Sequence, residues 1–251
     1  NFFIDNINES FSLLNSSISL PVLSLILPIG LSFHTFQALS YTIEVYRGNQ
    51  KAERHFGIYA LYVMFYPQLV AGPIERPQNI LHQFHEKKHF SSEFLISGLR
   101  LMLWGFFKKV VIADRLSVYV NGVFDNADEY GSLNLIIAAV FFSIEIYCDF
   151  SGYSDIAIGS AKVMGFDLMT NFNRPYFSKN IKEFWSRWHI SLSTWFRDYV
   201  YIPLGGNRGS KFKKYRNVFI VFVLSGFWHG ANWTFILWGL IHAILNMLYM
   251  A

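Results

Sequence analysis

Long apolar stretches alternate with short charged stretches along this chain. Five stretches are almost purely hydrophobic, and clusters of Lys and Arg lie between them. Apolar runs with basic flanks predict helices that lie in a membrane, with the charged clusters at its surfaces. The apolar runs are residues 18–43, 56–71, 94–113, 133–147 and 217–251.

Prolines interrupt two of these runs. Residues 18–43 contain Pro21 and Pro28, so this first span is expected to be kinked. Residues 56–71 are short, contain Pro67 and have basic residues on both sides. Because basic flanks favour one side of a membrane, the second run is predicted to be a re-entrant hairpin or a tilted partial span.

The last run, residues 217–251, contains no charged residue, but it is too long for one crossing. As a single helix it would measure about 50 Å, whereas the hydrocarbon core of a bilayer is about 30 Å thick. Gly226, Gly230 and Asn232 weaken a helix, so the run is predicted to break there. This break places the ionisable ring of His229 near mid-membrane depth, where such groups are usually functional.

Residues 182–201 have a strong helical period and are predicted to form one amphipathic helix that ends before Pro203. Polar residues lie opposite an aromatic face, so we expect the helix at an interface or around a cavity. Residues 208–216 then form a predicted basic loop. The aromatic face comprises Trp185, Trp188, His189, Leu192, Trp195, Phe196 and Tyr199.

Glu145, Asp149 and Asp155 lie within or beside apolar sequence, where carboxylates are costly. They are expected either to pair with an arginine farther along the chain or to shape a polar cavity. Lys108 and Lys109 close the preceding apolar run and are interpreted as an anchor at the membrane interface.

Residues 71–76 are a turn signal, and the predicted helix that follows contains His82, His85 and His89. On a helix these rings share one face and could bind a metal. Charged residues at 86–88 interleave them and no thiolate or carboxylate partner is evident, so an exposed surface helix is favoured and no metal is expected.

The composition agrees with an integral membrane protein: 53% of the 251 residues are hydrophobic and 15% are charged. The net charge is +4, but the basic residues form short clusters rather than one stripe, so membrane lipids are expected partners and nucleic acid is not. Cys148 is the single cysteine, which excludes an internal disulfide. We expect one membrane domain over residues 1–251, a fragment incomplete at both ends.

The surroundings of His229 suggest acid–base chemistry. On a helix, Ser225, Asn232 and Trp233 would share its face and could orient the ring. Burial favours the neutral imidazole, which can accept a proton from an alcohol. Alternatively, Gly226 and Gly230 are a packing groove and the histidine is a structural hydrogen bonder.

The chain resembles the membrane-bound O-acyltransferases, within them the alginate O-acetyltransferase-like branch. The resemblance implies a ring of transmembrane helices with re-entrant and interfacial helices around a central tunnel. It assigns the catalytic histidine to His229 and a second active-site position to His189. It rests on residues 28–48 (PIGLSFHTFQALSYTIEVYRG), 65–77 (FYPQLVAGPIERP), 147–159 (YCDFSGYSDIAIG), 171–206 (which contains EFWSRWHISLSTWF) and 225–239 (SGFWHGANWTFILWG).

This resemblance implies an enzyme of the bacterial inner membrane with several spans. It would move an acyl group, most simply acetyl, from a thioester donor (acetyl-CoA or an acyl carrier protein) to a hydroxyl of an exported polysaccharide or to a periplasmic acetylase partner. His229 would be the general base. Candidate oxyanion donors are Asn232, Trp228 and Trp233. Further candidate substrate-binding or tunnel residues are Ser225, Trp185, Trp188, Asp149, Asp155 and Arg197.

Three other functions fit the same pattern. D-alanyl transfer to teichoic acids would use the same fold. A transporter would use His229 and the buried acids as a proton relay. A scaffold for a periplasmic acetylase would need the histidines only for structure.

Overall fold

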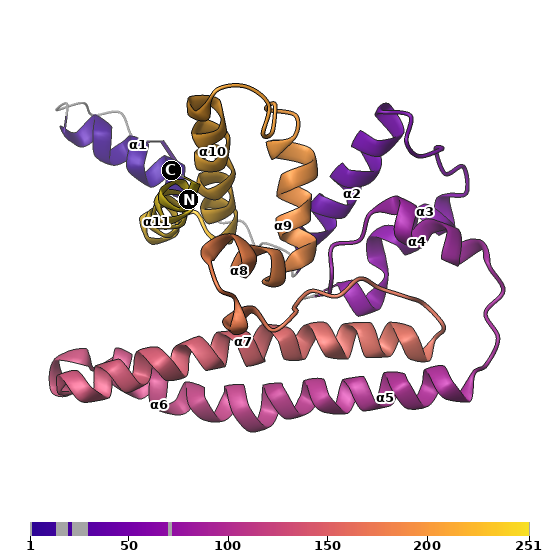
Figure 1. Cartoon of the computed structure of the whole chain (residues 1–251), viewed down its shortest axis with the longest axis horizontal. Coiled ribbons are helices and arrows are strands. Elements are labelled where there is room, and N and C mark those ends of the chain that lie inside the picture. Colours follow the sequence, from indigo (N-terminus) through magenta and orange to yellow (C-terminus); the bar gives the residue numbers. More distant parts are fainter. Residues whose placement is uncertain (1, 14–19, 22–29, 70–71, 251) are drawn as a thin grey trace. The chain divides into compact units, whose positions relative to one another are not determined.

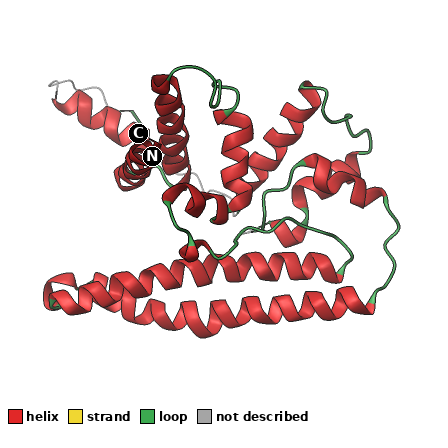
Figure 2. Cartoon of the chain, in the orientation of Figure 1, coloured by secondary structure: helices red, strands yellow, loops and turns green. Residues whose placement is uncertain are grey.

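The structure is a computed structural model that describes residues 2–13, 20–21, 30–69 and 72–250. Within these ranges the regular elements are all helices and no strand occurs (Figure 2), so the predicted all-α class is confirmed. Much of the predicted first span, including Pro28, lies outside the described residues. Its second half forms α2 (Leu31–Tyr46).

The chain divides into two compact units, which are described separately. Unit 1 comprises Asn1–Leu31, Phe177–Trp185 and Ser193–Ala251, and unit 2 comprises Ser32–Tyr176 and Ser186–Leu192. Unit 2 contains nearly all of α2, together with α3 (Phe56–Met64), α4 (Pro77–His85), α5 (Ser92–Phe106), η2 (Phe107–Ala113), α6 (Asp114–Phe124) and α7 (Ser132–Val163). Unit 1 contains α1 (Phe2–Leu13), most of α8 (Ile181–Arg187) and α9 (Ile190–Phe196), η5 (Arg197–Tyr201), α10 (Lys211–His229) and α11 (Trp233–Met250).

Helices α5 and α7 lie side by side in unit 2 (Figure 1) because facing glycines allow their backbones to touch. A Cβ atom built on Gly105 would lie 2.6 Å from the carbonyl oxygen of Gly152, and one built on Gly98 would lie 2.7 Å from that of Gly159. Any larger residue at these four positions would push the helices apart.

The predicted end of the third apolar run at residue 113 is wrong. Helix α5 continues without a break through η2, a π-helical segment, and into α6 as far as Phe124. Lys108 and Lys109 therefore lie inside a long helix and not at its end. Their role as an anchor at the membrane interface stays a prediction.

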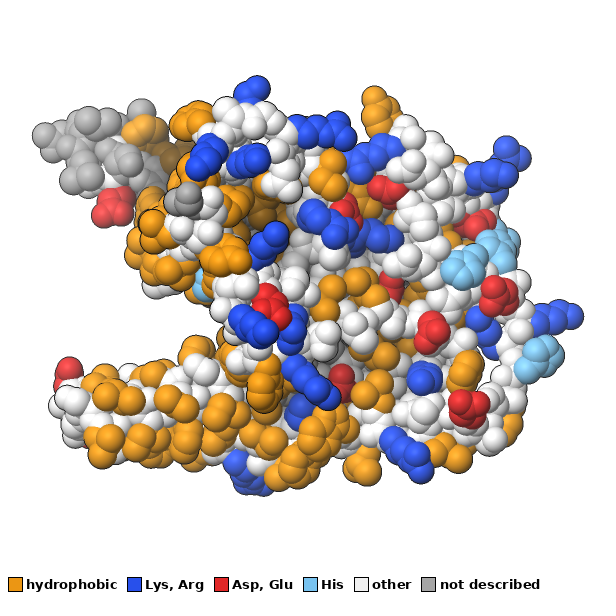
Figure 3. Space-filling view, in the orientation of Figure 1, with side chains coloured by type: hydrophobic (Ala, Val, Ile, Leu, Met, Phe, Trp, Pro, Cys, Tyr) orange, Lys and Arg blue, Asp and Glu red, His pale blue; other side chains and the backbone are white. Residues whose placement is uncertain are grey.

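Two described helices, α7 and α11, are long and apolar enough to cross a membrane by length and composition. Many large apolar side chains on the helices of unit 2 are exposed, among them Leu103, Val118 and Leu133, which are 70–71% exposed. Figure 3 shows hydrophobic side chains covering the surface of α6 and α7. An apolar surface of this extent fits contact with lipid.

Residues 56–71 form the nine-residue helix α3 followed by a short 3-10 turn at Tyr66–Gln68. Nine residues rise only about 13 Å, so α3 is too short to cross a bilayer. This agrees with the predicted interruption at Pro67, while residues 70–71 lie outside the described part. Tyr62 and Phe65 pack in a buried cluster with Ile80 and Leu81 of α4.

The predicted turn at residues 71–76 is present, and its Glu75 is 1% exposed. The Glu75 carboxylate accepts hydrogen bonds from the backbone N–H of Met169 and, at 3.0 Å, from the side-chain amide of Asn79. Burial raises the pKa of Glu75 above that of a free glutamate, against the effect of these bonds. Glu75 thus ties the loop before α4 to the loop that follows α7.

The prediction of a single helix over residues 182–201 is wrong. The helix breaks between α8 and α9 at His189, whose φ of 43° is in the left-handed region. A periodic pattern of aromatic residues cannot reveal this break, because it continues unchanged across it. The predicted basic loop is also partly wrong, because Ser210 caps α10 and Lys211 begins it.

The predicted break in the charge-free run is confirmed. Helix α10 ends at His229, Gly230 follows it in an extended conformation, and α11 begins at Trp233. The two helices approach closely at Gly226, where a Cβ atom would lie 2.3 Å from the carbonyl oxygen of Phe235 and 3.2 Å from the backbone of Gly239. Gly230, the other member of the expected packing groove, also lies against α11, because a Cβ atom built there would lie 2.4 Å from the ring of Phe235.

Candidate active site

His229 is the last residue of α10, at the point where the chain turns into α11. Its ring contacts three aromatic rings: the centroid distances are 4.8 Å to Trp228, 5.0 Å to Trp238 and 6.3 Å to Phe235. The side chain is exposed on the surface of the chain. His229 is therefore open to a ligand on one side.

Two of the predicted orienting neighbours, Asn232 and Trp233, do not share a helix face with His229, because α10 ends there, whereas Ser225 lies one turn earlier in the same helix. Asn232 instead begins α11, where its side-chain oxygen accepts hydrogen bonds from the backbone N–H and the hydroxyl of Thr234 at 3.1 and 3.2 Å. The Trp233 indole donates to Asn6 of α1 at 3.1 Å. Ser225 is buried one turn before His229, but no hydrogen bond joins these two described residues.

A second histidine of the charge-free run, His242, was missed by the sequence analysis and lies in the same unit. Its ring centroid is 4.6 Å from that of Trp238, which also contacts His229, and 5.0 Å from that of Trp185. The ring of Phe222 stacks on the His242 ring, with 6.2 Å between their centroids. The signal that singled out His229, an ionisable ring in a run without charges, applies equally to His242.

His189 belongs to unit 2 and is 3% exposed. Its ring meets Phe150 edge to face at 4.5 Å between centroids. The backbone around it is fixed by Asn171: Ile190 N–H donates to the Asn171 carbonyl at 2.9 Å and the Ser191 hydroxyl donates to the Asn171 side chain at 2.7 Å. These bonds hold the left-handed conformation of His189. Because His229 belongs to the other unit, convergence of the two rings on one tunnel stays a prediction.

Trp188, beside His189, lies in an aromatic cluster of unit 2. Its ring centroid is 5.1 Å from Phe172, 6.0 Å from Tyr176 and 6.2 Å from Tyr147. The Tyr176 hydroxyl donates to the backbone carbonyl of Ser143. Burial, chiefly, raises the pKa of Tyr176 to about 12, so this hydroxyl remains a donor at neutral pH. Trp188 is thus part of the packing that supports His189.

Asp149 and Asp155 of α7 pair with lysines upstream and not with arginines downstream, which corrects one of the two expectations for them. The third carboxylate, Glu145, makes no ion pair among the described residues, and one of its oxygens is buried without a hydrogen-bond partner there. Lys108, which is 6% exposed, donates to Asp155 at 2.8 Å and to the Ser151 hydroxyl at 2.8 Å. Lys109 pairs with Asp149 at 2.5 Å and with Asp114 at 2.7 Å. These ion pairs connect η2 to α7.

Arg197 lies in η5 of unit 1, and its side chain is 59% exposed. It pairs at 2.7 Å with its neighbour Asp198. A role for Arg197, Asp149 or Asp155 in a tunnel stays a prediction.

The three histidines near residue 85 do not form one face. Helix α4 ends at His85, so His89 lies beyond it. His82 Nδ1 lies 3.2 Å from the Gln78 carbonyl oxygen, and His85 Nε2 lies 2.7 Å from a carboxylate oxygen of Glu53. In the part of the chain that the structure describes, no group of three His, Cys, Asp or Glu is arranged to hold a metal ion.

Comparison with known proteins gives consistent results. Residues 55–250 match the family model "MBOAT, membrane-bound O-acyltransferase family". The chain is 45% identical over 242 residues to a protein of Azotobacter vinelandii named "Probable alginate O-acetylase AlgI", an alignment that covers 96% of this chain and 48% of that protein. It is 40% identical to the "Peptidoglycan O-acetyltransferase" of Helicobacter pylori, covering 91% of this chain and 48% of that protein.

A third relative is the "Teichoic acid D-alanyltransferase" of Bacillus subtilis, which is 32% identical over 240 residues and covers 91% of this chain and 60% of that protein. The chain thus spans about half the length of the first two curated relatives. Every histidine and tryptophan discussed above from Trp185 onward falls within the residues that match the family model.

Proposed function

Because this chain belongs to the membrane-bound O-acyltransferase family, we propose that the whole protein transfers an acetyl group from a thioester to a hydroxyl of an exported polysaccharide, or to a periplasmic acetylase partner. The observation that carries the proposal is the placement of His229, exposed at the break between two apolar helices and flanked by aromatic rings. The names of the relatives that are 45% and 40% identical support acetyl as the group and a polysaccharide as the acceptor.

In the proposed reaction, neutral His229 accepts the proton of the acceptor hydroxyl while the hydroxyl oxygen attacks the thioester carbonyl carbon. The tetrahedral intermediate then collapses, the carbon–sulfur bond breaks and the thiolate leaves, taking up the proton from His229. The products are an acetyl ester and a free thiol. The aromatic rings around His229 would exclude water from the open side once substrate is bound.

We further propose that the protein lies in the bacterial inner membrane with several spans, arranged as a ring around a tunnel that brings His189 and His229 together. The donor would be acetyl-CoA or an acyl carrier protein. The exposed apolar surface of α5–α7 and the apolar length of α7 and α11 support a membrane location. Asn232 lies just before α11, where its side-chain oxygen accepts from Thr234, and its side-chain N–H2 group is the donor that could bind the oxyanion.

Replacement of His229 tests the proposed function. In a strain that makes the acceptor polymer, the full-length His229→Ala variant should reduce O-acetyl groups on the exported polymer by about 10²- to 10⁴-fold, the usual contribution of a general base. His82→Ala, which changes an exposed histidine of α4, is the matched control and should have no effect. Both variants must be present in the membrane at the wild-type level.

The same experiment separates the alternative functions. Unchanged acetylation in the His229→Ala strain would contradict the enzyme proposal. A loss of polymer export, rather than of acetylation alone, would favour a transporter. D-alanyl transfer is the second candidate because a D-alanyltransferase is 32% identical to the chain, and D-alanine esters in place of acetyl esters on the polymer would support it.

A further inference from the structure

Two buried polar atoms in unit 1 have no hydrogen-bond partner among the described residues: Nδ1 of His242 and Nε1 of Trp185. They belong to one cluster, because the two rings lie 5.0 Å apart between centroids and meet edge to face. A buried donor without a partner is unfavourable, because it has lost its hydrogen bonds to water and gained none in exchange. Two such atoms in contacting rings indicate that a polar group from outside the described chain completes the site.

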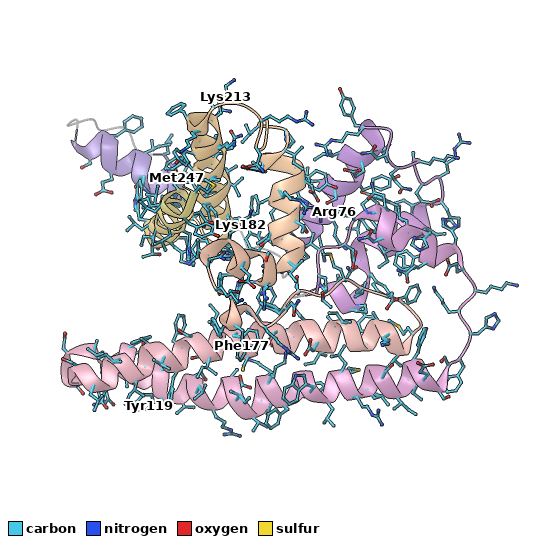
Figure 4. All side chains as sticks on the ribbon, viewed as in Figure 1. Arg76, Tyr119, Phe177, Lys182, Lys213 and Met247 are labelled. Atoms are coloured by element: carbon cyan, nitrogen blue, oxygen red, sulfur yellow. The ribbon has the colours of Figure 1, made fainter. Side chains whose placement is uncertain are left out.

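The walls of this cluster are aromatic. Trp185 lies 5.4 Å from Phe222 and 5.7 Å from Trp238 between ring centroids. Phe222 and Trp238 also contact His242. The helices concerned are α8, α10 and α11, whose side chains are shown in Figure 4 together with the labelled Lys182, Lys213 and Met247. Apolar walls around a few nitrogen atoms are typical of a small-molecule site.

Trp238 connects this cluster to the proposed general base. Its indole lies 5.0 Å from the His229 ring and 4.6 Å from the His242 ring, so one side chain separates the two histidines. A group that reacts beside His229 is therefore within one ring of the two unpartnered nitrogens.

The chemistry of the nitrogens defines the missing group. An indole N–H can only donate a hydrogen bond, and neutral histidine donates from Nδ1 in one of its two tautomers. The partner of Trp185 must therefore be an acceptor, and His242 can bind the same acceptor when its proton is on Nδ1. During acyl transfer, the acceptor atom that gains negative charge is the carbonyl oxygen of the thioester, and donors placed at this oxygen stabilise the transition state.

Resting on the proposed function, we propose that Trp185 and His242 bind the carbonyl oxygen of the acyl group and stabilise its negative charge during transfer. This assigns a role in the transfer to His242. In this arrangement His229 contacts the acceptor hydroxyl and receives the proton of that hydroxyl.

The test uses the full-length protein in inverted membrane vesicles that contain the acceptor polymer, with acetyl-CoA as the probe and release of the free thiol as the readout. Trp185→Phe and His242→Phe keep an aromatic ring but remove the N–H group. Each should lower kcat by about 10²- to 10³-fold, as loss of one oxyanion donor does, with little change in KM. His242→Gln retains an N–H donor and should recover part of the rate.

Trp195→Phe is the control, because it removes an indole N–H from a buried tryptophan that contacts Phe196 and Tyr199 and lies outside this cluster. An equal loss of kcat in Trp195→Phe would contradict the proposal, as would a rise in KM at unchanged kcat in Trp185→Phe. Wild-type kcat in both Trp185→Phe and His242→Phe, with His229→Ala inactive, would overturn this inference alone. Activity in His229→Ala would instead overturn the proposed function.

Discussion

The glycine contact between α5 and α7 gives the sharpest stability prediction. We consider Gly105→Ala. The new Cβ atom would lie 2.6 Å from the Gly152 carbonyl oxygen and 2.8 Å from a side-chain carbon of Ile156, whereas ordinary contacts begin at 3.4 Å. Because backbone atoms cannot turn aside as a side chain can, the helices must separate locally by about 0.8 Å, the difference between these limits.

A separation of this size has a calculable cost. A gap of about 0.5–1 Å forfeits a quarter to a half of each dispersion contact across it, and overpacked helix contacts typically cost about 1–3 kcal/mol. Alanine also favours a helix over glycine by about 1 kcal/mol, which partly masks the effect. The control must therefore be a glycine-to-alanine change that has the same gain in helix propensity but no steric clash between helices.

Gly122 of α6 provides this control, because a Cβ atom built there has no neighbour within 4 Å. The difference in unfolding free energy between Gly105→Ala and Gly122→Ala should be about 1–3 kcal/mol, with Gly105→Ala the less stable. For a domain of this size, this corresponds to a difference in Tm of roughly 2–12 °C. Thermal unfolding of the purified full-length variants in detergent, followed by tryptophan fluorescence, measures it.

The double variant Gly105→Ala/Gly152→Ala tests the cause. If the cost arises from separation of the helices at this one contact, the second alanine should cost less than it does alone. Equal Tm values for Gly105→Ala and Gly122→Ala would refute the reasoning. Full additivity in the double variant would show that the two glycines act independently.

Three further outcomes are expected. Asp155→Ala should destabilise the protein by about 3–5 kcal/mol, since it leaves the buried Lys108 ammonium without its carboxylate, and Lys108→Met added to it should restore part of the Tm. Burial raises the pKa of Glu75 in the folded state, so its contribution to stability should fall as the pH rises from its unfolded-state pKa of 4.5 through its folded-state pKa. The Tm of Glu75→Gln should therefore rise relative to the wild-type Tm between pH 4 and pH 8. A Tm difference that does not change with pH would contradict the raised pKa. Gly226→Ala should reduce acetyl transfer at least tenfold at a normal membrane level, because its Cβ would meet the Phe235 carbonyl oxygen at 2.3 Å and displace α10 beside the active site; wild-type activity would contradict this.

The parts of the fold that the sequence predicted are those set by local physics. The break beside His229 follows from the length of the charge-free run and from its glycines, and the shortness of α3 follows from Pro67. Composition predicted the apolar outer surface.

The parts that escaped prediction depend on contacts between distant residues. The kink at His189 is held by Asn171, and nothing in the local period marks it. Asp155 and Asp149 of α7 pair with Lys108 and Lys109, 40 or more residues earlier, and such partners can be chosen only when helix pairing is known. His242 was missed for another reason: its place beside Trp185 requires α8 and α11 to meet.

The π-helical segment η2 determines the helical phase of everything that follows it. A π turn holds one residue more than an α turn, so η2 is equivalent to a single-residue insertion in an otherwise continuous helix. Deleting one residue within it would restore the α-helix and rotate α6 by about 100° relative to α5. Val120 and Val123, which are 2% and 1% exposed, would then turn away from their present contacts. One additional residue thus decides which side of this long helix packs against α7 and which side is exposed.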